Sequence, residues 1–345
     1  MIKVENGKKY YLGVDVGSIS TNVAVIDESR KVIESVYIRT EGKPIQAVQN
    51  GIRIMRNKLG VDLPIHGAGA TGSARQLTGV LIGADIVKNE ITAHALAAIQ
   101  YRPDVQTVLE IGGQDSKIII LRDGVAIDFA MNTVCAAGTG SFLDQQARRI
   151  KIPIESFGNF ALKSNNPVSI AGRCTVFAES DMIHKQQLGY PEKDIIRGLC
   201  EALVRNYLNN VGKGKEIRPP IMFQGGVAAN KGIRKAFAES LGYEIIVPEH
   251  YDVMGAIGAA ILAQEEMEKE PRPSNFLGWD IPQLQFQTTG FECADCPNMC
   301  EIVEIIKNEK LIARWGSKCG KWDDLTVERR THMEKKDDFS QILAE

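Results

Sequence analysis

A two-strand pattern with an acidic, glycine-containing turn occurs twice in the sequence, and this repeat constrains the fold most. Segment 11–27, YLGVDVGSISTNVAVID, places an apolar strand before Asp15 and a Gly-Ser turn, and a second apolar strand follows. Segment 108–121, VLEIGGQDSKIIIL, repeats this plan with Glu110 and a Gly-Gly turn. Both segments predict β-hairpins, so the chain contains an internal duplication.

A second pair of segments extends the repeat. HGAGATG (66–72) and QGGVAAN (224–230) each follow an apolar run and precede a helix-like stretch. Between the two halves, segment 89–100 has helix formers at helical spacing. Segment 253–270 begins rich in Gly and Ala and becomes charged, as a helix leaving a core would, and the Pro-rich segment 270–274 follows it.

These patterns predict three regions with a boundary near residue 270. We expect a first half at 1–98, joined by a helix at about 252–268, and a second half at 99–251. Residues 270–345 form a Cys-rich C-terminal appendage of different composition. At 345 residues and 44% hydrophobic, the chain is long enough for two core-forming domains and a small appendage.

Charge and hydropathy limit the classes of partner. A formal net charge of −2 gives no global attraction to nucleic acid or to an anionic membrane. No apolar stretch reaches the roughly 18 residues needed to span a bilayer, and the N-terminal segment has no signal-peptide pattern. The sequence therefore predicts a cytoplasmic protein whose partners are a nucleotide and another protein.

The two hairpin turns carry the chemistry of phosphate binding. Backbone N–H groups in Gly turns approach phosphate oxygens closely because no Cβ intervenes, and an acidic residue at a strand end holds Mg²⁺ through water. One such turn is weak evidence, because an ordinary hairpin has the same residues. Two facing hairpins, together with Gly225-Gly226 and Gly255 to Gly258 at the openings of later helices, predict nucleotide binding.

The frame from about residue 10 to 265 resembles the actin, sugar-kinase and heat-shock-chaperone ATPase superfamily. The resemblance implies an α/β fold of two ribonuclease-H-like halves with ATP and Mg²⁺ in the cleft between them. It implies a first phosphate loop of Asp15, Gly17, Ser18, Ser20 and Thr21, and a second of Glu110, Gly112, Gly113, Gln114 and Asp115. Gly225, Gly226 and Asn230 match adenosine contacts, Gly255 is a further nucleotide contact, and Glu90 matches an acidic residue that orients a Mg²⁺-bound water.

The resemblance gives Asp15, Glu110 and Asp115 the catalytic roles. Glu110 departs from the Asp that is usual at its position, and the extra methylene changes how the carboxylate reaches metal or water.

Seven cysteines in such a protein favour metal ligands, catalytic thiols or small core residues over disulfides. Cys135 and Cys174 each precede a predicted helix, whose N-terminus stabilises a thiolate or an anionic cluster. A cubane cluster normally takes four thiolates, so two from each of two subunits would complete it. Spacing alone favours the alternative that both are buried small hydrophobes. Cys200 falls on the apolar face of a predicted helix and is expected in the core.

Segment 134–150, VCAAGTGSFLDQQARRI, together with Cys174, resembles the activators of 2-hydroxyacyl-CoA dehydratases. The ATPase subunits of benzoyl-CoA reductase and the reductases of double-cubane-cluster proteins are close kin. The resemblance implies a homodimer with one [4Fe–4S] cluster held by Cys135 and Cys174 of both chains. It also implies that ATP hydrolysis to ADP drives a low-potential electron onto a partner iron–sulfur enzyme, with a ferredoxin or flavodoxin as upstream donor.

Four further cysteines lie near the C-terminus. Cys293, Cys296 and Cys300 follow a C-x2-C-x3-C pattern, and eighteen residues that include a predicted hairpin separate Cys300 from Cys319. Four thiolates suit Zn²⁺ or a second cubane equally on count. The spacing resembles a zinc ribbon more than a ferredoxin, so Zn²⁺ is preferred, and a second cluster or metal-free thiols stay open. Minimal activators lack this appendage, so a partner other than a dehydratase also stays open.

Two alternative functions share the nucleotide motifs. A small-molecule (sugar) kinase of the same superfamily needs an acceptor pocket and no cluster, and a regulator that senses ATP or iron needs no partner reduction. The leading hypothesis is an ATP hydrolase coupled to electron transfer.

Overall fold

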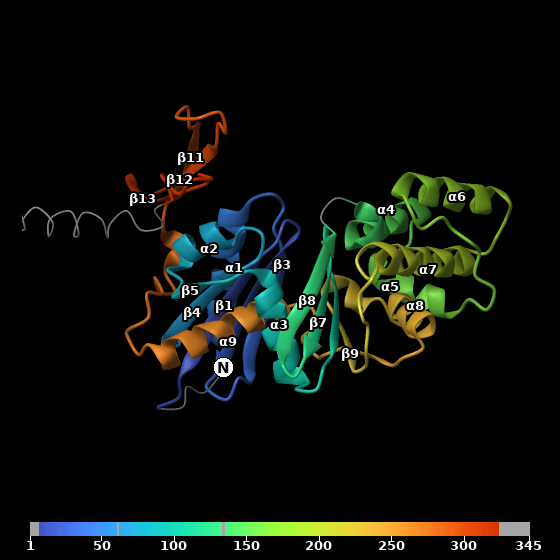
Figure 1. Ribbon diagram of the computed structural model, residues 1–345, viewed down its shortest axis with the longest axis horizontal. Coiled ribbons are helices and arrows are strands. Elements are labelled where there is room, and N and C mark those ends of the chain that lie inside the picture. The colour runs from blue at the N-terminus through green and yellow to red at the C-terminus, as the bar shows by residue number, and fades with distance from the viewer. Residues whose placement is uncertain (1–6, 61, 133–134, 324–345) are drawn as a thin grey trace, which may run out of the picture.

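A computed structural model of the chain describes residues 7–60, 62–132 and 135–323. Two five-stranded sheets stand side by side with helices around them, and a small three-stranded sheet sits apart at one end (Figure 1). The predicted α/β fold of two similar halves with a C-terminal appendage is confirmed. The limits 1–98, 99–251 and 270–345 remain predictions, and residues 1–6 and 324–345 lie outside the described residues.

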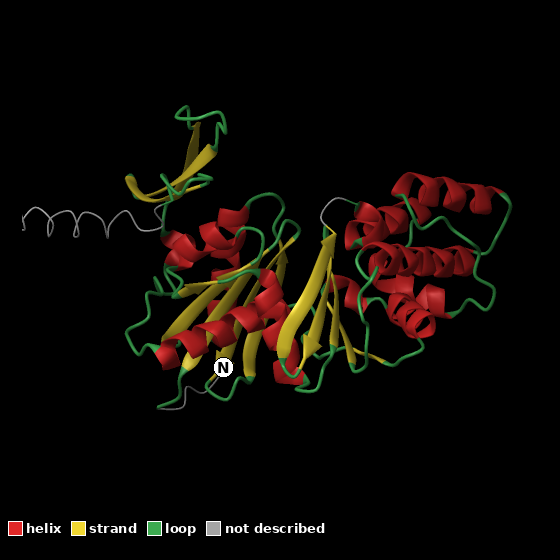
Figure 2. Cartoon of the chain, in the orientation of Figure 1, coloured by secondary structure: helices red, strands yellow, loops and turns green. Residues whose placement is uncertain are grey.

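The first sheet has the strand order β3-β2-β1-β4-β5. Its strands are β1 (Tyr10–Val16), β2 (Ser20–Asp27), β3 (Val32–Arg39), β4 (Ile65–Thr71) and β5 (Ile86–Val87). β1, β2 and β3 are antiparallel neighbours, whereas β4 pairs with β1, and β5 with β4, in parallel. Every residue of β1 is buried, because helices cover both faces of this sheet (Figure 2).

Four helices cover the first sheet. They are α1 (Pro44–Leu59), α2 (Arg75–Ile82), α3 (Glu90–Tyr101) and α9 (Met254–Lys269). Alternate residues of β1 point to opposite sides: Leu12 packs in the core under α1 and α2, and Tyr11 packs in the core under α3 and α9. This alternation explains why the strand reads as a nearly continuous apolar run.

Helix α9 lies directly on the sheet because glycines remove the side chains between them. A Cβ built on Gly13 of β1 would lie 1.9 Å from the carbonyl oxygen of Ala256, and one on Gly69 of β4 would lie 2.1 Å from that of Ala259. No other residue fits at these two contacts without moving the helix. The close contact brings the start of α9 beneath the β1–β2 turn.

The second sheet has the order β10-β9-β6-β7-β8. Read from β8 to β10, this order matches that of the first sheet, with β6 in the central position of β1. Its strands are β6 (Thr107–Ile111), β7 (Ser116–Arg122), β8 (Val125–Asn132), β9 (Ile221–Gln224) and β10 (Ile245–Ile246). β6, β7 and β8 are antiparallel, and β9 and β10 join in parallel. The duplication seen in the sequence is therefore a duplication of sheet topology.

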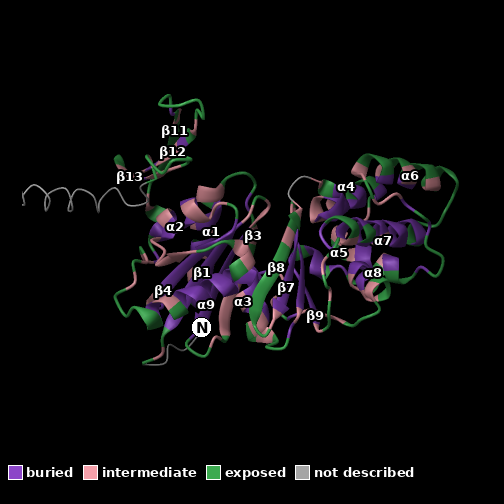
Figure 3. Ribbon diagram, in the orientation of Figure 1, coloured by how far each residue is buried: buried purple, intermediate pink, exposed green. Residues whose placement is uncertain are grey.

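A helical layer follows β8 and packs on one face of the second sheet. It contains η1 (Ala136–Gly138), α4 (Gly140–Ile150), α5 (Ile154–Leu162), α6 (Thr175–Gln187), α7 (Glu192–Asn210), η2 (Gly226–Ala229) and α8 (Lys231–Leu241). Its apolar sides form one core with the sheet, and Cys200 of α7 is fully buried there, as expected. Figure 3 shows the buried inner sides of these helices and the exposed edge strand β8.

The appendage is a three-stranded antiparallel sheet of β11 (Phe286–Glu292), β12 (Glu301–Lys307) and β13 (Lys310–Trp315), preceded by η3 (Ile281–Gln283). The predicted hairpin corresponds to β12 and β13. Ile305 and Ala313 join the core of the first half, and Gln49 of α1 donates to the carbonyl oxygen of Leu284 at 2.8 Å. No helix in the described part of the chain is long and apolar enough to span a membrane.

Candidate functional site

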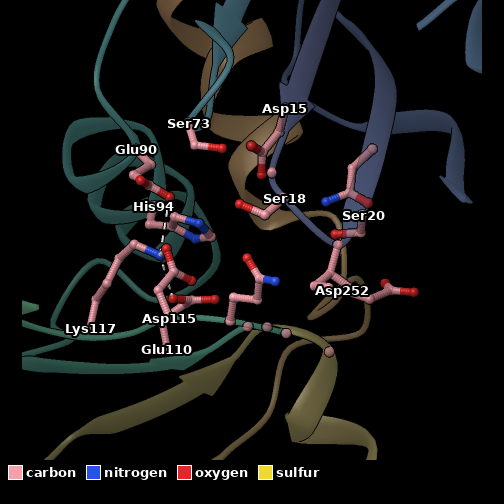
Figure 4. Close-up of a pocket in the computed structure, with 18 of the residues that line it drawn as sticks. Asp15, Ser18, Ser20, Ser73, Glu90, His94, Glu110, Asp115, Lys117 and Asp252 are labelled. Atoms are coloured by element: carbon pink, nitrogen blue, oxygen red, sulfur yellow. Dashed lines mark hydrogen bonds and ion pairs between the residues drawn. The ribbon is translucent and has the colours of Figure 1, made fainter. Parts of the chain in front are cut away.

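A cleft opens where the β1–β2 turn of the first half faces the β6–β7 turn of the second (Figure 4). Residues from both halves line it: Asp15, Gly17, Ser18, Ile19, Ser20, Asn22, Tyr37, Ser73, Glu90, His94, Glu110, Gly112, Gly113, Gln114, Asp115, Lys117, Gly225, Gly226 and Asp252. Most residues of the two predicted phosphate loops are therefore brought together in one cleft.

The first turn is held by hydroxyl groups behind it. Gly17 N–H donates to the carbonyl oxygen of Ser20 at 2.9 Å, and the Thr40 hydroxyl donates to the carbonyl oxygen of Gly17 at 2.9 Å. Thr21 is fully buried, and its hydroxyl lies 2.9 Å from that of Thr40. Ser18 and Ser20 line the cleft, whereas Thr21 supports the turn from behind.

Glycines allow the β6–β7 turn to lie close to the β1–β2 turn. Gly112 N–H donates to the carbonyl oxygen of Asp115 at 3.0 Å, which closes the turn. A Cβ on Gly113 would lie 2.5 Å from Cγ1 of Ile19 in the opposite hairpin. The two turns therefore approach each other only because Gly113 has no side chain.

A buried lysine joins three of the acidic residues. Nζ of Lys117 lies 3.0 Å from a carboxylate oxygen of each of Glu90, Glu110 and Asp115 (Figure 4). Its side chain is 2% exposed. The sequence interpretation missed Lys117, although its cross-strand pairing with Glu110 in the predicted β6–β7 hairpin gave a signal.

Two further carboxylates, Asp15 and Asp252, line the cleft, and Asp15 lies across it from Lys117 (Figure 4). Burial and, after it, the nearby charge of Glu90 together raise the pKa of Asp15 to about 7. Burial likewise raises the pKa of Glu110 to about 8, although Lys117 works against this shift. A cation entering the cleft would offset both effects, so the site favours binding of positive charge.

Carboxylates from both halves offer the oxygen ligands that Mg²⁺ prefers. Among the described residues, no three His, Cys, Asp or Glu side chains are grouped as a ready metal site. Magnesium typically keeps several waters and binds through one or two carboxylates plus substrate phosphates. The residues present therefore fit Mg²⁺ that arrives with a nucleotide, rather than a metal enclosed by protein ligands.

His94 lines the cleft, and Gln224 of β9 contacts it from behind. Nδ1 of His94 lies 2.8 Å from Nε2 of Gln224, and both side chains are buried. Burial lowers the pKa of His94 to about 3, so the imidazole is neutral at physiological pH. His94 follows Glu90 by one turn of α3, a spacing that places both on one face of the helix and that the sequence interpretation did not use.

A second pocket adjoins the cleft on the side of the second half. It is lined by Ile19, Tyr37, Arg39, Gly112, Gly113, Gly140, Leu143, Asp144, Ile154, Glu155, Gly158, Asn159, Gly226, Val227, Ala229, Asn230 and Lys231. Gly225, which lines the first cleft next to the shared Gly226, has a φ of 88°, and a Cβ there would lie 2.4 Å from the carbonyl oxygen of Ile111. Asn230 caps α8 by accepting hydrogen bonds from Gly232 N–H at 2.9 Å and Ile233 N–H at 3.2 Å.

Gly255 supports the cleft from the first residues of α9. A Cβ at this position would lie 2.2 Å from Oδ2 of Asp15. Gly255 does not line either pocket, and its lack of a side chain makes room for the Asp15 carboxylate.

Cys135 and Cys174 lie outside the cleft, and each caps the N-terminus of a helical segment. Cys135 precedes η1 and α4, Cys174 precedes α6, and both are half-buried. The side-chain amide of Asn132 makes two hydrogen bonds to the backbone of Cys135. It donates to the carbonyl oxygen at 2.7 Å and accepts from the N–H at 3.0 Å.

One buried asparagine of α7 touches both cysteine segments. Nδ2 of Asn206 donates to the carbonyl oxygen of Gly172 at 2.6 Å, two residues before Cys174. A Cβ on Gly138, three residues after Cys135, would lie 2.8 Å from Oδ1 of Asn206. The two cysteine segments therefore rest against the same rigid helix.

Helix α4 connects the Cys135 segment to the cleft. Gly140 N–H donates to the carbonyl oxygen of Gly112 at 2.9 Å, and Ser141 N–H donates to that of Gly113 at 2.8 Å. The Ser141 hydroxyl also donates to Gly113 O at 2.5 Å. The first turn of α4 is thus bonded directly to the glycines of the second phosphate turn.

The remaining cysteines of the predicted metal set lie elsewhere. Cys293, Cys296, Cys300 and Cys319 are all in the appendage, which stands on the opposite side of the molecule from α4 and α6 (Figure 1). The structure does not bring them to Cys135 or Cys174.

Two topologically equivalent halves with facing glycine turns define an ATPase of the actin-like fold. The sequence model of the BadF/BadG/BcrA/BcrD ATPase family matches residues 12–263, and the chain belongs to this family. The resemblance to dehydratase activators is thereby confirmed, while the appendage lies beyond the matched residues.

Individual relatives agree with this assignment. The chain is 33% identical over 270 residues to the (R)-2-hydroxyglutaryl-CoA dehydratase activating ATPase of Acidaminococcus fermentans, covering 75% of this chain and 99% of the relative. It is 31% identical to the 2-hydroxyisocaproyl-CoA dehydratase activator of Clostridioides difficile, covering 76% and 98%. The solved structure of the activator of the 2-hydroxyisocaproyl-CoA dehydratase from Clostridium difficile with bound ADPNP superimposes with a TM-score of 0.70 at 31% identity, covering 75% of this chain and 96% of that one.

Proposed function

We propose that the protein is an ATP-dependent, low-potential electron donor. Two chains hold one [4Fe–4S] cluster between them, and ATP hydrolysis drives an electron from it to a partner iron–sulfur enzyme. Two relatives are named as a dehydratase-activating ATPase and a dehydratase activator, which supports a 2-hydroxyacyl-CoA dehydratase as the partner. A double-cubane-cluster protein is the alternative partner in this proposal. A ferredoxin or flavodoxin serves as the upstream donor.

The cleft binds Mg–ATP and releases ADP. The backbone N–H groups and hydroxyls of the two turns hold the phosphates, using Gly17, Ser18, Ser20, Gly112, Gly113 and Gln114. Asp15, Glu110 and Asp115 hold Mg²⁺ and the attacking water, and Glu90 orients a metal-bound water. The pocket beside Gly225, Gly226 and Asn230 accommodates adenosine, in keeping with the ADPNP bound to the related activator.

The residues around Cys135 and Cys174 fit a shared cluster. Each chain has two half-buried thiols, each at the start of a helical segment where N–H groups favour negative charge. A two-fold axis through this region supplies four thiolates, the usual ligand number of a cubane. When bound, the cluster supplies one-electron chemistry at a low potential.

Exposed apolar side chains support a dimer at this end of the molecule. Val176 and Phe177 come two and three residues after Cys174 and are 66% and 65% exposed. β8, which ends three residues before Cys135, exposes Ile127 and Phe129. Large apolar side chains exposed around an anionic site favour burial against another protein surface.

The single observation that carries the proposal is the pair of hydrogen bonds from the start of α4 to Gly112 and Gly113. Any shift of this turn on binding or losing the γ-phosphate is passed to α4 and so to Cys135. Glu179 of α6 passes it further, since it pairs with Arg149 of α4 at 2.7 Å. Both cysteine segments therefore respond to the state of the nucleotide.

Protein purified without oxygen tests the function. We expect broad visible absorbance that dithionite bleaches, and electron transfer to an iron–sulfur acceptor enzyme that requires Mg–ATP and fails with a non-hydrolysable analogue. A colourless anaerobic preparation that releases ADP only with a sugar would instead identify a small-molecule kinase. Absorbance and ATP turnover with no transfer to any acceptor would identify a regulator.

A further inference from the structure

Two loops meet at the outer end of the three-stranded sheet and contain four of the seven cysteines. Loop 293–300 joins β11 to β12 and contributes Cys293, Cys296 and Cys300. Loop 316–320 follows β13 and contributes Cys319. Because β11, β12 and β13 are consecutive antiparallel neighbours, the chain leaves β11 and β13 at the same end of the sheet, and both loops lie there.

The first loop folds back on itself in two tight turns. Cys293 N–H donates to the carbonyl oxygen of Cys300 at 2.8 Å, which brings the two ends of the loop together. Met299 N–H donates to the carbonyl oxygen of Cys296 at 3.2 Å, and Met299 has a φ of 44°. Three cysteines are thereby confined to one compact turn.

The second loop packs onto the first through contacts made to its thiols. Lys318 N–H points at Sγ of Cys300 at 3.5 Å, and the indole N–H of Trp322 donates to Sγ of Cys293 at 3.3 Å. Cys319 lies between these two donors in sequence. N–H groups that donate to sulfur stabilise thiolates, and such outer contacts typically surround thiolate ligands of metals.

Charged side chains join the loops as well. Lys321 pairs with Asp295, and Nζ of Lys318 lies 3.5 Å from Oδ1 of Asn298. Four thiolates around a divalent cation leave two negative charges in excess. Lys318, next to Cys319, is placed to offset part of this excess, whereas Asp295 already balances the charge of Lys321.

The appendage has little core of its own to hold these loops. Its fully buried apolar residues among those described are Ile281, Ile302, Ile305 and Ala313, and all but Ile302 pack in the core of the first half. Most of β11 is exposed. Units this small typically depend on disulfides or a metal for stability. The loops at this end have turns and hydrogen bonds but no helix or strand.

We propose that Cys293, Cys296, Cys300 and Cys319 bind one structural Zn²⁺ ion that fastens the two loops together. Tetrahedral Zn²⁺ with thiolates at about 2.3 Å suits two short loops that meet at one end of a sheet. No three of these thiols are gathered as a ready ligand set in the described part of the chain. Binding therefore draws the exposed Cys296 and Cys319 toward Cys293 and Cys300, and metal binding and loop ordering are coupled.

The position of the loops favours zinc over a second cluster. They stand on the opposite side of the molecule from α4 and α6, so an electron from here would have to cross the first half (Figure 1). Cys296 and Cys319 are exposed, which suits a redox-inert ion better than a low-potential cluster. This inference stands independently of the proposed electron transfer, because it rests on different residues.

Zinc and iron analysis of the full chain tests the proposal. Wild-type protein, purified without oxygen and washed with a chelator, should retain about one zinc per chain. Cys296→Ser and Cys319→Ser should each lose the zinc and keep iron and ATP binding. Cys135→Ser is the matched control, since it removes a thiol at the other end of the molecule and should keep the zinc while losing iron.

Co²⁺ substitution gives a second readout that does not depend on retained zinc. The substituted wild-type chain should show thiolate-to-cobalt charge-transfer absorption, and Cys319→Ser should lose it. Wild-type protein without zinc or cobalt binding, or zinc retained in both serine variants, would overturn the proposal. Loss of iron from the Cys296 and Cys319 variants, with no zinc in the wild type, would show a second cluster there.

Discussion

Replacing Lys117 by Met removes the buried cation that pairs with the buried Glu110 and with the half-buried Glu90 and Asp115. Its Nζ lies 3.0 Å from Glu90, Glu110 and Asp115, and the side chain is 2% exposed. Breaking a buried ion pair from one side typically costs about 3–5 kcal/mol, because the remaining charge loses its partner. Glu110 can respond by taking up a proton, since burial already raises its pKa to about 8. We therefore expect a loss near the lower limit, about 3 kcal/mol in the free energy of unfolding.

Urea denaturation followed by circular dichroism, in chelator and without nucleotide, measures this loss. Lys215→Met is the matched control, because Lys215 pairs with Asp128 at 2.7 Å at the surface and its removal should cost at most about 1 kcal/mol. Adding Glu110→Gln to Lys117→Met should recover part of the loss by removing one unpaired charge. Equal, small losses in the two lysine variants would refute the reasoning, as would no recovery in the double variant.

Three further predictions address other parts of the molecule. Asp15→Asn and Asp115→Asn should each lower ATP hydrolysis about a hundredfold without loss of iron, and unchanged turnover in both would remove the catalytic assignment. Phe177→Asp should weaken self-association in analytical ultracentrifugation. Tyr243 is also exposed, and Tyr243→Asp is the control that should leave self-association unchanged. Equal dimerisation of the two variants would contradict the proposed interface. Burial alone would raise the pKa of Asp85, but hydrogen bonds, first from the Ser274 hydroxyl, outweigh it and lower this pKa. Asp85→Asn should therefore cost about 2 kcal/mol at neutral pH, and the difference should vanish as pH falls through the folded pKa of Asp85, so a pH-independent difference would argue against it.

The two hairpins were predictable because their signals are local. Apolar runs that reach Asp15 or Glu110, each with a glycine two residues later and a second apolar run beyond it, predict strand, turn and strand without tertiary information. The same order of elements in both halves then limits the topology to two similar sheets. The roles of individual glycines were less predictable, since Gly113 is needed only because Ile19 of the other half approaches it.

The side chains facing the cleft could have been predicted better from strand alternation. Ser20 and Asn22 line the cleft, and Thr21 between them points the other way, toward Thr40. Successive residues of a strand point to opposite faces. Because Ser20 was predicted to contact the nucleotide, Asn22 should have been predicted to face the cleft as well, and Thr21 to face away from it.

Residues whose contacts join segments far apart in the sequence could not be predicted from local sequence patterns. Asn206 lies in the middle of α7, and its contacts with the loops of Cys135 and Cys174 depend on how three segments pack. The hydrogen bonds from α4 to Gly112 and Gly113 likewise join segments that a helix-by-helix interpretation treats separately. Such contacts require the folded structure.

The central claim is that Cys135 and Cys174 of two chains share one cluster, and iron per dimer tests it most directly. Protein prepared without oxygen should contain about four irons per wild-type dimer. Cys135→Ser and Cys174→Ser should each contain none, because symmetry removes two of four thiolates at once, and both should bind ATP as the wild type does. Variants that keep the wild-type iron content and spectrum would contradict the shared cluster and leave both cysteines as structural residues.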